Sequence, residues 1–198
     1  MIRILLASRN SGKLREFETL LPEVHWFTLP ATVSELPETG TFFEENARQK
    51  LEAARSWYEQ QSALLVDGIL SDDSGLCVDA LWGGPGVLTA HFGPGLSAQE
   101  RNIKLLTLLN PYDPRSARYV CVLAWWQPNQ GIKIFSGVAE GSLARTPRGC
   151  KGFGYDPIFQ PYPSEKTFGE MEDLDKNLVS HRGLATQALR NYLELSQK

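Results

Sequence analysis

The chain has 198 residues, of which 42% are hydrophobic and 22% charged, and its formal net charge at pH 7 is −3. This composition is typical of one globular domain with a sizeable core, and it excludes a largely disordered chain. The net negative charge argues against the broad basic surface that binds nucleic acid, although a small anionic ligand needs only a local basic cluster.

The cysteines and the amino terminus indicate the compartment. Cys77, Cys121 and Cys150 are odd in number and widely spaced, so neither a disulfide framework nor a paired zinc motif is predicted. The first apolar run is too short for a signal peptide, and no stretch is long enough to cross a membrane. We therefore expect a cytoplasmic protein without a membrane partner. The length of the chain predicts that residues 1–198 form a single domain.

The first half of the chain alternates between predicted strands and helices. Residues 2–7 are an apolar run typical of a strand, and the polar residues 8–13 form a loop before a helix. Residues 42–61 are predicted to form a longer helix with an apolar face. Two short strands are expected on either side of a sharp turn at residues 71–76, and a loop rich in glycine and proline follows.

The second half contains a predicted hairpin between helices. Ser97 and Glu100 form a capping-box pattern at the start of a helix over residues 97–109. Residues 119–126 and 132–138 are rich in β-formers and predict an antiparallel hairpin. A glycine-rich loop precedes a last helix that Ser180 is placed to cap. This order of elements favours an α/β architecture with a mixed sheet.

The predicted turn at residues 71–76 reads Ser-Asp-Asp-Ser-Gly-Leu and places two carboxylates side by side. Magnesium prefers oxygen ligands and usually binds together with substrate phosphates, so an Asp-Asp pair indicates phosphate chemistry. The same residues are also typical of an ordinary turn, in which Asp and Ser side chains bond to the backbone.

The polar loop at residues 8–13 is a second candidate. It precedes a helix, whose free backbone N–H groups and dipole attract anions, and Arg9 and Lys13 add positive charge. It is not a standard P-loop, because Ala7 and Leu14 stand where that motif needs Gly and Ser or Thr. A capping loop with a solvated lysine is the alternative interpretation.

Two further segments carry candidate polar groups. Asn46 and Lys50 share a face at the start of the long predicted helix, whereas Glu44 and Glu45 are typical of a solvated helix surface. In residues 152–157 two glycines and two aromatic rings could receive a flat heterocycle, or the rings could anchor the loop on the core. A single histidine such as His181 at the start of a helix is more often a surface residue.

Taken in order, these segments resemble the inosine triphosphate pyrophosphatase family over nearly the whole chain. The motifs are Ser8-Arg9-Asn10-Ser11-Gly12-Lys13, Phe43-Glu44-Glu45-Asn46-Ala47, Ser71-Asp72-Asp73-Ser74-Gly75-Leu76, Gly84-Pro85-Gly86, Gly152-Phe153-Gly154-Tyr155-Asp156-Pro157-Ile158-Phe159, Asp175-Lys176-Asn177 and Ser180-His181-Arg182-Gly183. The resemblance implies an α/β fold with a mixed, elongated central sheet flanked by helices, and two lobes with an active-site cleft between them.

The same resemblance implies an activity. Members of this family hydrolyse deaminated purine nucleoside triphosphates such as ITP, dITP and XTP to the monophosphate and pyrophosphate, with Mg²⁺ as cofactor. A homodimer that binds a small-molecule nucleotide, and no nucleic acid, is expected. Trp82, Leu88 and Phe92 could serve the dimer interface or could belong to the core.

The resemblance also assigns roles to residues. Asp73 is expected to accept the proton of the attacking water and, together with Glu38, to bind the metal ion. Residues 8–13 and Lys50 are expected to bind the triphosphate, Ser74 to contact the substrate, and the residues further along the chain to recognise the base. The expected substrate-binding residues are Ser8, Arg9, Asn10, Ser11, Gly12, Lys13, Lys50, Ser74, Phe153, Gly154, Tyr155, Asp156, Lys176, His181 and Arg182.

Some positions depart from the family pattern, and two other functions stay open. Ser8 and Arg9 replace a common Thr-Gly pair, and His91 stands where an arginine contact is usual, so His91 is not assigned to the site. A related pyrophosphatase could act on modified pyrimidine or methylated nucleotides. A sensor that binds purine triphosphates without cleaving them is a different class, and it would not need a carboxylate such as Asp73 to activate water.

Overall fold

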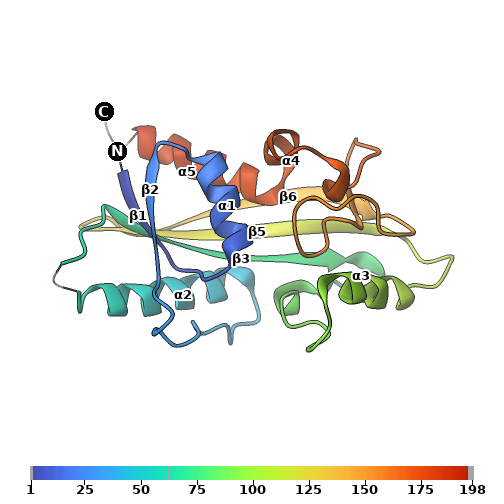
Figure 1. The fold of residues 1–198 in the computed structure, drawn as a ribbon, viewed down its shortest axis with the longest axis horizontal. Coiled ribbons are helices and arrows are strands. Elements are labelled where there is room, and N and C mark those ends of the chain that lie inside the picture. Colours follow the sequence, from blue (N-terminus) through green and yellow to red (C-terminus); the bar gives the residue numbers. More distant parts are fainter. Residues whose placement is uncertain (1, 62, 196–198) are drawn as a thin grey trace. The chain divides into compact units, whose positions relative to one another are not determined.

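The computed structural model describes residues 2–61 and 63–195. The chain divides into two compact units, each built from separate stretches of sequence (Figure 1). Unit 1 comprises residues 1–73, 121–136 and 185–198, and unit 2 comprises residues 74–120 and 137–184. The described strands are β1 (Ile2–Leu6), β2 (Val24–Thr28), β3 (Gly68–Val78), β4 (Gly84–Pro85), β5 (Ser116–Gln127), β6 (Gly131–Leu143) and β7 (Phe159–Pro161). They form one seven-stranded sheet in the order β2-β1-β3-β5-β6-β7, with β4 paired to β3.

Unit 1 contains the parallel part of the sheet. Its elements are β1 (Ile2–Leu6), α1 (Ser11–Leu20), β2 (Val24–Thr28), α2 (Phe43–Tyr58) and parts of β3 (Gly68–Val78), β5 (Ser116–Gln127), β6 (Gly131–Leu143) and α5 (His181–Leu195). Strand β1 pairs in parallel with β2 and with β3. Helix α2 covers one face of these strands, while α1 and α5 cover the other (Figure 1).

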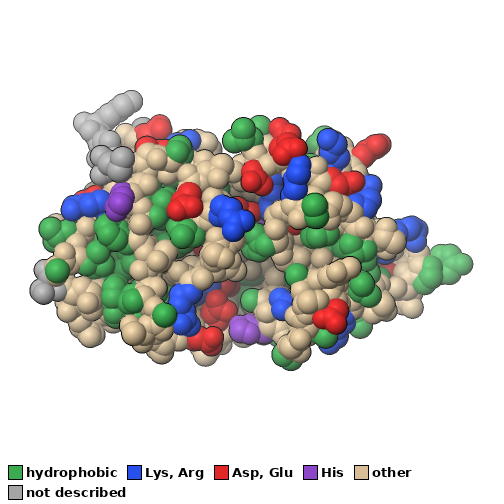
Figure 2. Space-filling model, viewed as in Figure 1, with side chains coloured by type: hydrophobic (Ala, Val, Ile, Leu, Met, Phe, Trp, Pro, Cys, Tyr) green, Lys and Arg blue, Asp and Glu red, His purple; other side chains and the backbone are tan. Residues whose placement is uncertain are grey.

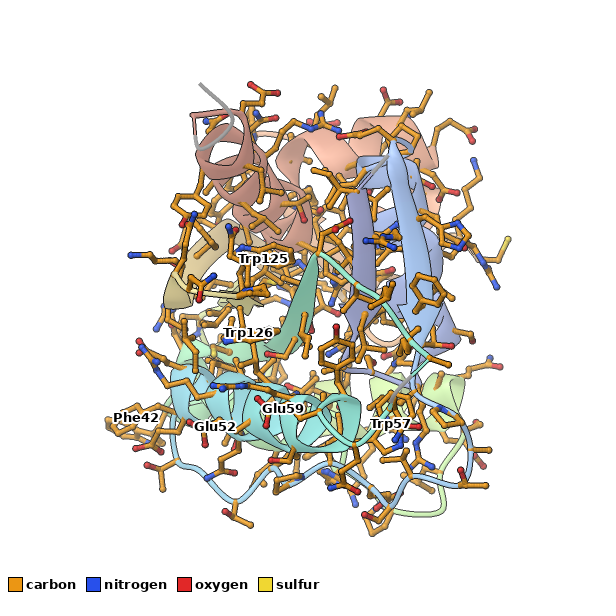
Figure 3. All side chains as sticks on the ribbon, turned by 90° about the vertical axis from the view of Figure 1, so that its left-hand side faces the viewer. Phe42, Glu52, Trp57, Glu59, Trp125 and Trp126 are labelled. Carbon is orange, nitrogen blue, oxygen red and sulfur yellow. The ribbon has the colours of Figure 1, made fainter. Side chains whose placement is uncertain are left out.

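The two faces of unit 1 are packed differently. Trp125 belongs to the cluster that includes Ile4, Phe17 and Leu189, and the next residue, Trp126, lies against Tyr58 of α2 on the other face (Figure 3). Strand alternation explains the split, since successive side chains point to opposite faces. The Trp125 ring fills the space beside Gly68, where a Cβ would lie 2.0 Å from the ring. Only glycine therefore fits at the start of β3.

Unit 2 contains antiparallel pairs and the shorter elements. Besides the remaining parts of β3, β5, β6 and α5, it holds η1 (Asp79–Leu81), β4 (Gly84–Pro85), η2 (Gly86–Leu88), α3 (Ala98–Thr107), β7 (Phe159–Pro161), η3 (Phe168–Glu170) and α4 (Asp173–Val179). Strand β4 is antiparallel to β3, and β7 is antiparallel to β6. Its core is centred on Tyr119, Phe159 and Phe168, whose rings lie close together.

Most predicted elements are confirmed, and the mixed α/β sheet with flanking helices is the observed fold class. The capping box is present at α3, where the Ser97 hydroxyl accepts from the Glu100 N–H at 3.2 Å. The hairpin strands β5 and β6 are both longer than predicted. The short elements β2, β7 and α4 were not predicted.

The sharp turn predicted at residues 71–76 is wrong. These residues lie inside the continuous strand β3, whose alternation sends Asp72 toward Lys13 of α1 and Asp73 toward Lys50 of α2. Each carboxylate meets a lysine on its own face, so neither has to leave the strand to be neutralised. The two carboxylates are therefore held on rigid backbone rather than on a loop.

Two of the three apolar residues that could serve a dimer interface are exposed. Trp82 is 99% exposed, and Leu88 is exposed as well, whereas Phe92 packs against the core of unit 2. Basic and acidic side chains are interspersed on the face shown in Figure 2. Among the described helices, none has both the length and the apolar character that a membrane span requires.

Candidate active site

The predicted phosphate loop begins helix α1. The Asn10 side-chain oxygen accepts hydrogen bonds from the N–H groups of Gly12 at 2.9 Å and Lys13 at 3.2 Å, and so caps the helix. The Ser8 hydroxyl accepts from the Asn10 N–H at 3.2 Å. Residues 11–13 are thus the first turn of α1 rather than loop, and two N–H groups expected to bind an anion are bonded to Asn10.

Lys13 forms an ion pair with Asp72 of β3. Its Nζ also donates to the Asp72 carbonyl oxygen at 3.2 Å. The Asp72 side chain is fully buried, whereas 15% of the Lys13 side chain is exposed. Cys121 adds a weak thiol hydrogen bond to the Asp72 carboxylate at 3.3 Å. The ammonium of Lys13 is therefore fixed beside Asp72 at the start of α1, and the Lys13 side chain as a whole is still partly exposed.

Lys50 joins the two predicted metal ligands. Its Nζ lies 2.7 Å from Glu38 Oε1 and 2.7 Å from Asp73 Oδ1. Lys50 and Asp73 are buried, and 29% of the Glu38 side chain is exposed. The structure thus brings Glu38, Lys50 and Asp73 together, as predicted, in a cluster with two carboxylates and one ammonium.

Burial and neighbouring charges shift the pKa values of both Asp73 and Lys50. Burial raises the pKa of Asp73 above its ordinary value, and the attraction of Lys50 and Lys13 offsets this only in part. Burial alone would lower the pKa of Lys50, but the charges and hydrogen bonds of Asp73 and Glu38 raise it instead. Both pKa shifts favour the protonated form of the group concerned.

The same donor set fits a divalent cation. Two carboxylates already converge on one positive charge, the Lys50 ammonium. Within the described part of the chain, no group of three or more His, Cys, Asp and Glu side chains is placed to hold a metal ion. Two carboxylates without further protein ligands suit Mg²⁺, which commonly completes its shell with water and substrate phosphates.

Arg9 is directed toward the segment between β2 and α2. Its Nη1 donates to the Val33 carbonyl at 3.3 Å, and its Nη2 lies 4.0 Å from Glu35 Oε1. The segment that carries Glu38 is therefore tied to the start of α1. These contacts are within the chain, so the contact of Arg9 with the substrate stays a prediction.

A second group of predicted residues lies in unit 2, around Asp156. The Asp156 carboxylate accepts from the Phe153 N–H at 2.8 Å and from Lys176 Nζ at 2.7 Å. Both Asp156 and Lys176 are buried. Gly152 has a positive φ of 69°, and a Cβ there would lie 1.9 Å from the Asp156 carboxylate. The glycine is required for the close approach that folds this loop onto Asp156.

Two cations face the ring of Phe153. Lys176 Nζ lies 5.3 Å and Arg182 Cζ 5.8 Å from its centroid, within the range of cation–π attraction. Arg182 is buried, and its Nη2 donates to the Ser74 hydroxyl at 3.2 Å. The structure thus gathers Ser74, Phe153, Lys176 and Arg182 within unit 2.

The sequence left two interpretations open for two rings in this group, and the structure shows that both rings are buried. His181 is not a surface residue: it is buried and stacks on Tyr119, with ring centroids 4.5 Å apart and planes 7° apart. Tyr155 does not offer an open face, because it is buried in the core of unit 2 and its hydroxyl donates to the Thr89 carbonyl at 3.4 Å. Burial also raises the pKa of Tyr155 to about 12.

Comparison with known proteins places the chain in a family. The model of the Ham1 family matches residues 4–192. The chain belongs to the Ham1 family. The "dITP/XTP pyrophosphatase" of Staphylococcus epidermidis is 38% identical over 197 residues, which are 98% of this chain and 97% of that protein.

Solved structures of this family agree with the fold. The Ham1 protein of Staphylococcus aureus superposes with a TM-score of 0.83 at 36% identity and covers 99% of this chain and 100% of its own. A HAM1 protein from Coxiella burnetii gives 0.81 at 39% identity, with coverage of 98% and 99%. In this chain, one of the two groups of polar residues described above lies in each unit.

Three residues that contact the candidate site were not among the expected site residues. Asp72 pairs with Lys13, Asn46 bonds to Asp73, and Tyr119 stacks on His181. The alternation of a strand could have indicated Asp72, because an Asp-Asp pair within a strand must face both sides of the sheet. Nothing in the local sequence indicates the stacking role of Tyr119.

Proposed function

We propose that this protein hydrolyses deaminated purine nucleoside triphosphates, such as ITP, dITP and XTP, to the monophosphate and pyrophosphate. The observation that carries the proposal is the cluster of Glu38, Lys50 and Asp73, in which two carboxylates converge on one ammonium. The printed name of the Staphylococcus epidermidis relative, a dITP/XTP pyrophosphatase, supports this substrate class.

We assign Mg²⁺ as the cofactor, held by Glu38 and Asp73. When bound, it would neutralise charge on the triphosphate and on the departing pyrophosphate. Asp73 would accept a proton from the attacking water. Water would attack near the α-phosphorus and release pyrophosphate in a single displacement, without a covalent intermediate.

The lysines and the capped helix would bind the triphosphate. Lys13, whose side chain is partly exposed, would bind phosphate oxygens, and Lys50 would stabilise charge that develops beside Asp73. Ser8, Arg9, Asn10, Ser11 and Gly12 are proposed to surround the phosphates at the start of α1. Ser74 directly follows Asp73 in β3, and we propose that it contacts the substrate next to the reacting group.

Base recognition is proposed for the unit 2 group. Hypoxanthine and xanthine carry an acceptor oxygen at C6, whereas adenine carries a donor amino group, so donors from Lys176, His181 and Arg182 would favour the former. An unpaired buried donor costs about 1–3 kcal/mol, and several together give strong discrimination. Phe153, Gly154, Tyr155 and Asp156 would shape this side of the site, with Asp156 holding Lys176 in place.

Hydrolysis of a nucleotide panel tests the function. ITP, dITP, XTP, ATP, GTP and several modified pyrimidine triphosphates are incubated with the protein and Mg²⁺, and the products are separated. We expect pyrophosphate and monophosphate from the deaminated purines, and none without the metal ion. Preferential cleavage of modified pyrimidines would support the related house-cleaning activity, and binding without cleavage would support a sensor.

We also propose that the protein acts in the cytoplasm as a homodimer. The exposed Trp82 and Leu88 give unit 2 an apolar surface that a second copy could cover. Light scattering gives the molar mass in solution. A monomer at micromolar concentration would contradict the dimer.

A further inference from the structure

Asn46, in the first turn of α2, is a polar side chain that is only 1% exposed. Amides are rarely buried to this extent unless hydrogen bonds replace those lost with water. Its two hydrogen bonds therefore indicate what it does.

One hydrogen bond of Asn46 is to Asp73, and the other is to the segment that carries Glu38. Asn46 Nδ2 donates to Asp73 Oδ2 at 3.2 Å, and Asn46 Oδ1 accepts from the Gly40 N–H at 2.8 Å. A carboxylate only accepts and a backbone N–H only donates, so a single orientation of the amide satisfies both partners. The amide thus links Asp73 to the segment before α2.

That segment carries Glu38, two residues before Gly40. It is seated closely on the helix, because a Cβ at Gly40 would lie 2.6 Å from Glu45 Cβ and 2.9 Å from Asn46 Oδ1. One turn further along α2, Lys50 bonds to Glu38 and to Asp73 Oδ1. Each Asp73 oxygen therefore has a partner from α2, and Asn46 and Lys50 each connect Asp73 to the Glu38 segment.

We propose that Asn46 is a positioning residue that holds Asp73 and the Glu38 segment in the geometry needed to bind the divalent cation together. Lys50 neutralises part of the negative charge of the two carboxylates. Asn46 is neutral, and its hydrogen bond fixes the rotation of the Asp73 carboxylate. The inference rests on the proposed function, in which Glu38 and Asp73 are the metal ligands. Asn46 itself contacts neither the cation nor the substrate.

The test measures metal binding and turnover separately. Mn²⁺ alone is titrated into wild type and Asn46→Ala, and free Mn²⁺ is followed by electron paramagnetic resonance. Because partners of metal ligands typically contribute about 10–100-fold to metal affinity or activity, we expect the Mn²⁺ dissociation constant to rise by about that factor. With ITP, kcat should fall while KM changes little. An unchanged Mn²⁺ affinity, or a wild type that binds no Mn²⁺, would overturn the proposal.

Two further variants separate positioning from general stability. Gln49→Ala is the matched control, because Gln49 lies on the same helix and bonds to Thr39 of the same segment at 3.0 Å without touching Asp73. Its Mn²⁺ affinity should stay near wild type, and an equal loss would contradict a specific role for Asn46. Asn46→Asp keeps the shape and the acceptor for Gly40 but faces Asp73 with a like charge. Wild-type kcat in this variant would overturn the role toward Asp73.

The two proposals can fail independently. If Asn46→Ala weakens Mn²⁺ binding while wild type cleaves none of the nucleotides, the positioning role stands and the proposed function does not. If wild type hydrolyses ITP and Asn46→Ala matches it in Mn²⁺ affinity and kcat, the function stands and the positioning role is wrong.

Discussion

The two groups of candidate site residues surround their cations with different partners. In unit 1, Lys50 lies between the carboxylates of Glu38 and Asp73, so negative charge is in excess. In unit 2, Lys176 has Asp156 as its partner, while Arg182 has the Ser74 hydroxyl and the face of Phe153. The unit 2 group therefore gathers buried hydrogen-bond donors beside an aromatic ring.

This difference matches two kinds of ligand. A cluster with excess carboxylates attracts a cation, and through it the phosphates, whereas buried donors suit the neutral oxygen of a base. The contrast predicts that variants in unit 1 change the chemical step and that variants in unit 2 change stability and base preference.

The largest expected effect is on turnover. Asp73→Asn removes the proposed proton acceptor and one metal ligand while keeping the shape of the side chain. We expect kcat for ITP to fall by about 10²–10⁴-fold, the usual contribution of a general base. Circular dichroism should show a folded protein. Activity near wild type would remove Asp73 from the mechanism.

The next largest expected effect is a loss of folding stability caused by a substitution in unit 2. Asp156→Asn leaves the Lys176 ammonium buried without its counter-charge, which typically costs about 3–5 kcal/mol of the free energy of unfolding. Urea denaturation measures the loss. Glu38→Gln is the matched comparison, because Glu38 is partly exposed and Lys50 keeps Asp73 as a partner. Equal losses in the two variants would contradict the contrast between the units.

Local and distant interactions explain which parts of the fold were predictable. The capping box of Ser97 and Glu100 lies within one turn, and the structure confirms it. The turn at Asp72 and Asp73 was wrong because the lysines that neutralise them stand 59 and 23 residues away. Partners this distant leave no local pattern, so two adjacent carboxylates look like a turn when only their neighbours are read.

In the candidate site as well, the sequence indicated individual residues but not the distant contacts that hold them. Resemblance of motifs pointed to Glu38, Lys50 and Asp73, which the structure brings together. It did not provide the residues that hold them, such as Asn46, because supporting contacts depend on how the helix sits on the strand. The burial of His181 was not predictable for the same reason, since Tyr119 stacks on it from a distant strand.

A smaller effect should appear in base preference. Arg182→Ala removes one proposed donor to the C6 oxygen, so kcat/KM for ITP should fall by the equivalent of about 1–3 kcal/mol. The kcat/KM for ATP should change less, so the ratio of kcat/KM for ITP to that for ATP should fall. Arg182→Lys keeps the charge and controls for packing. An unchanged ratio of ITP to ATP would assign the selectivity to other residues.

The smallest effect concerns the stack that holds His181. Tyr119→Leu removes the ring parallel to the imidazole, and such aromatic contacts contribute about 0.5–1.5 kcal/mol beyond their buried area. We expect a modest rise in KM for ITP with kcat nearly constant, because His181 belongs to the base-recognition group and not to the carboxylate cluster.

Tyr119→Phe separates this role from packing. Tyr119 also contacts Phe159 and Phe168, so the leucine variant should lose stability as well as substrate affinity. The phenylalanine variant keeps every ring contact and should retain the wild-type KM. If both variants raise KM equally, the hydroxyl rather than the stack would matter. If Tyr119→Leu lowers kcat at constant KM, the division between a chemical group in unit 1 and a recognition group in unit 2 would be wrong.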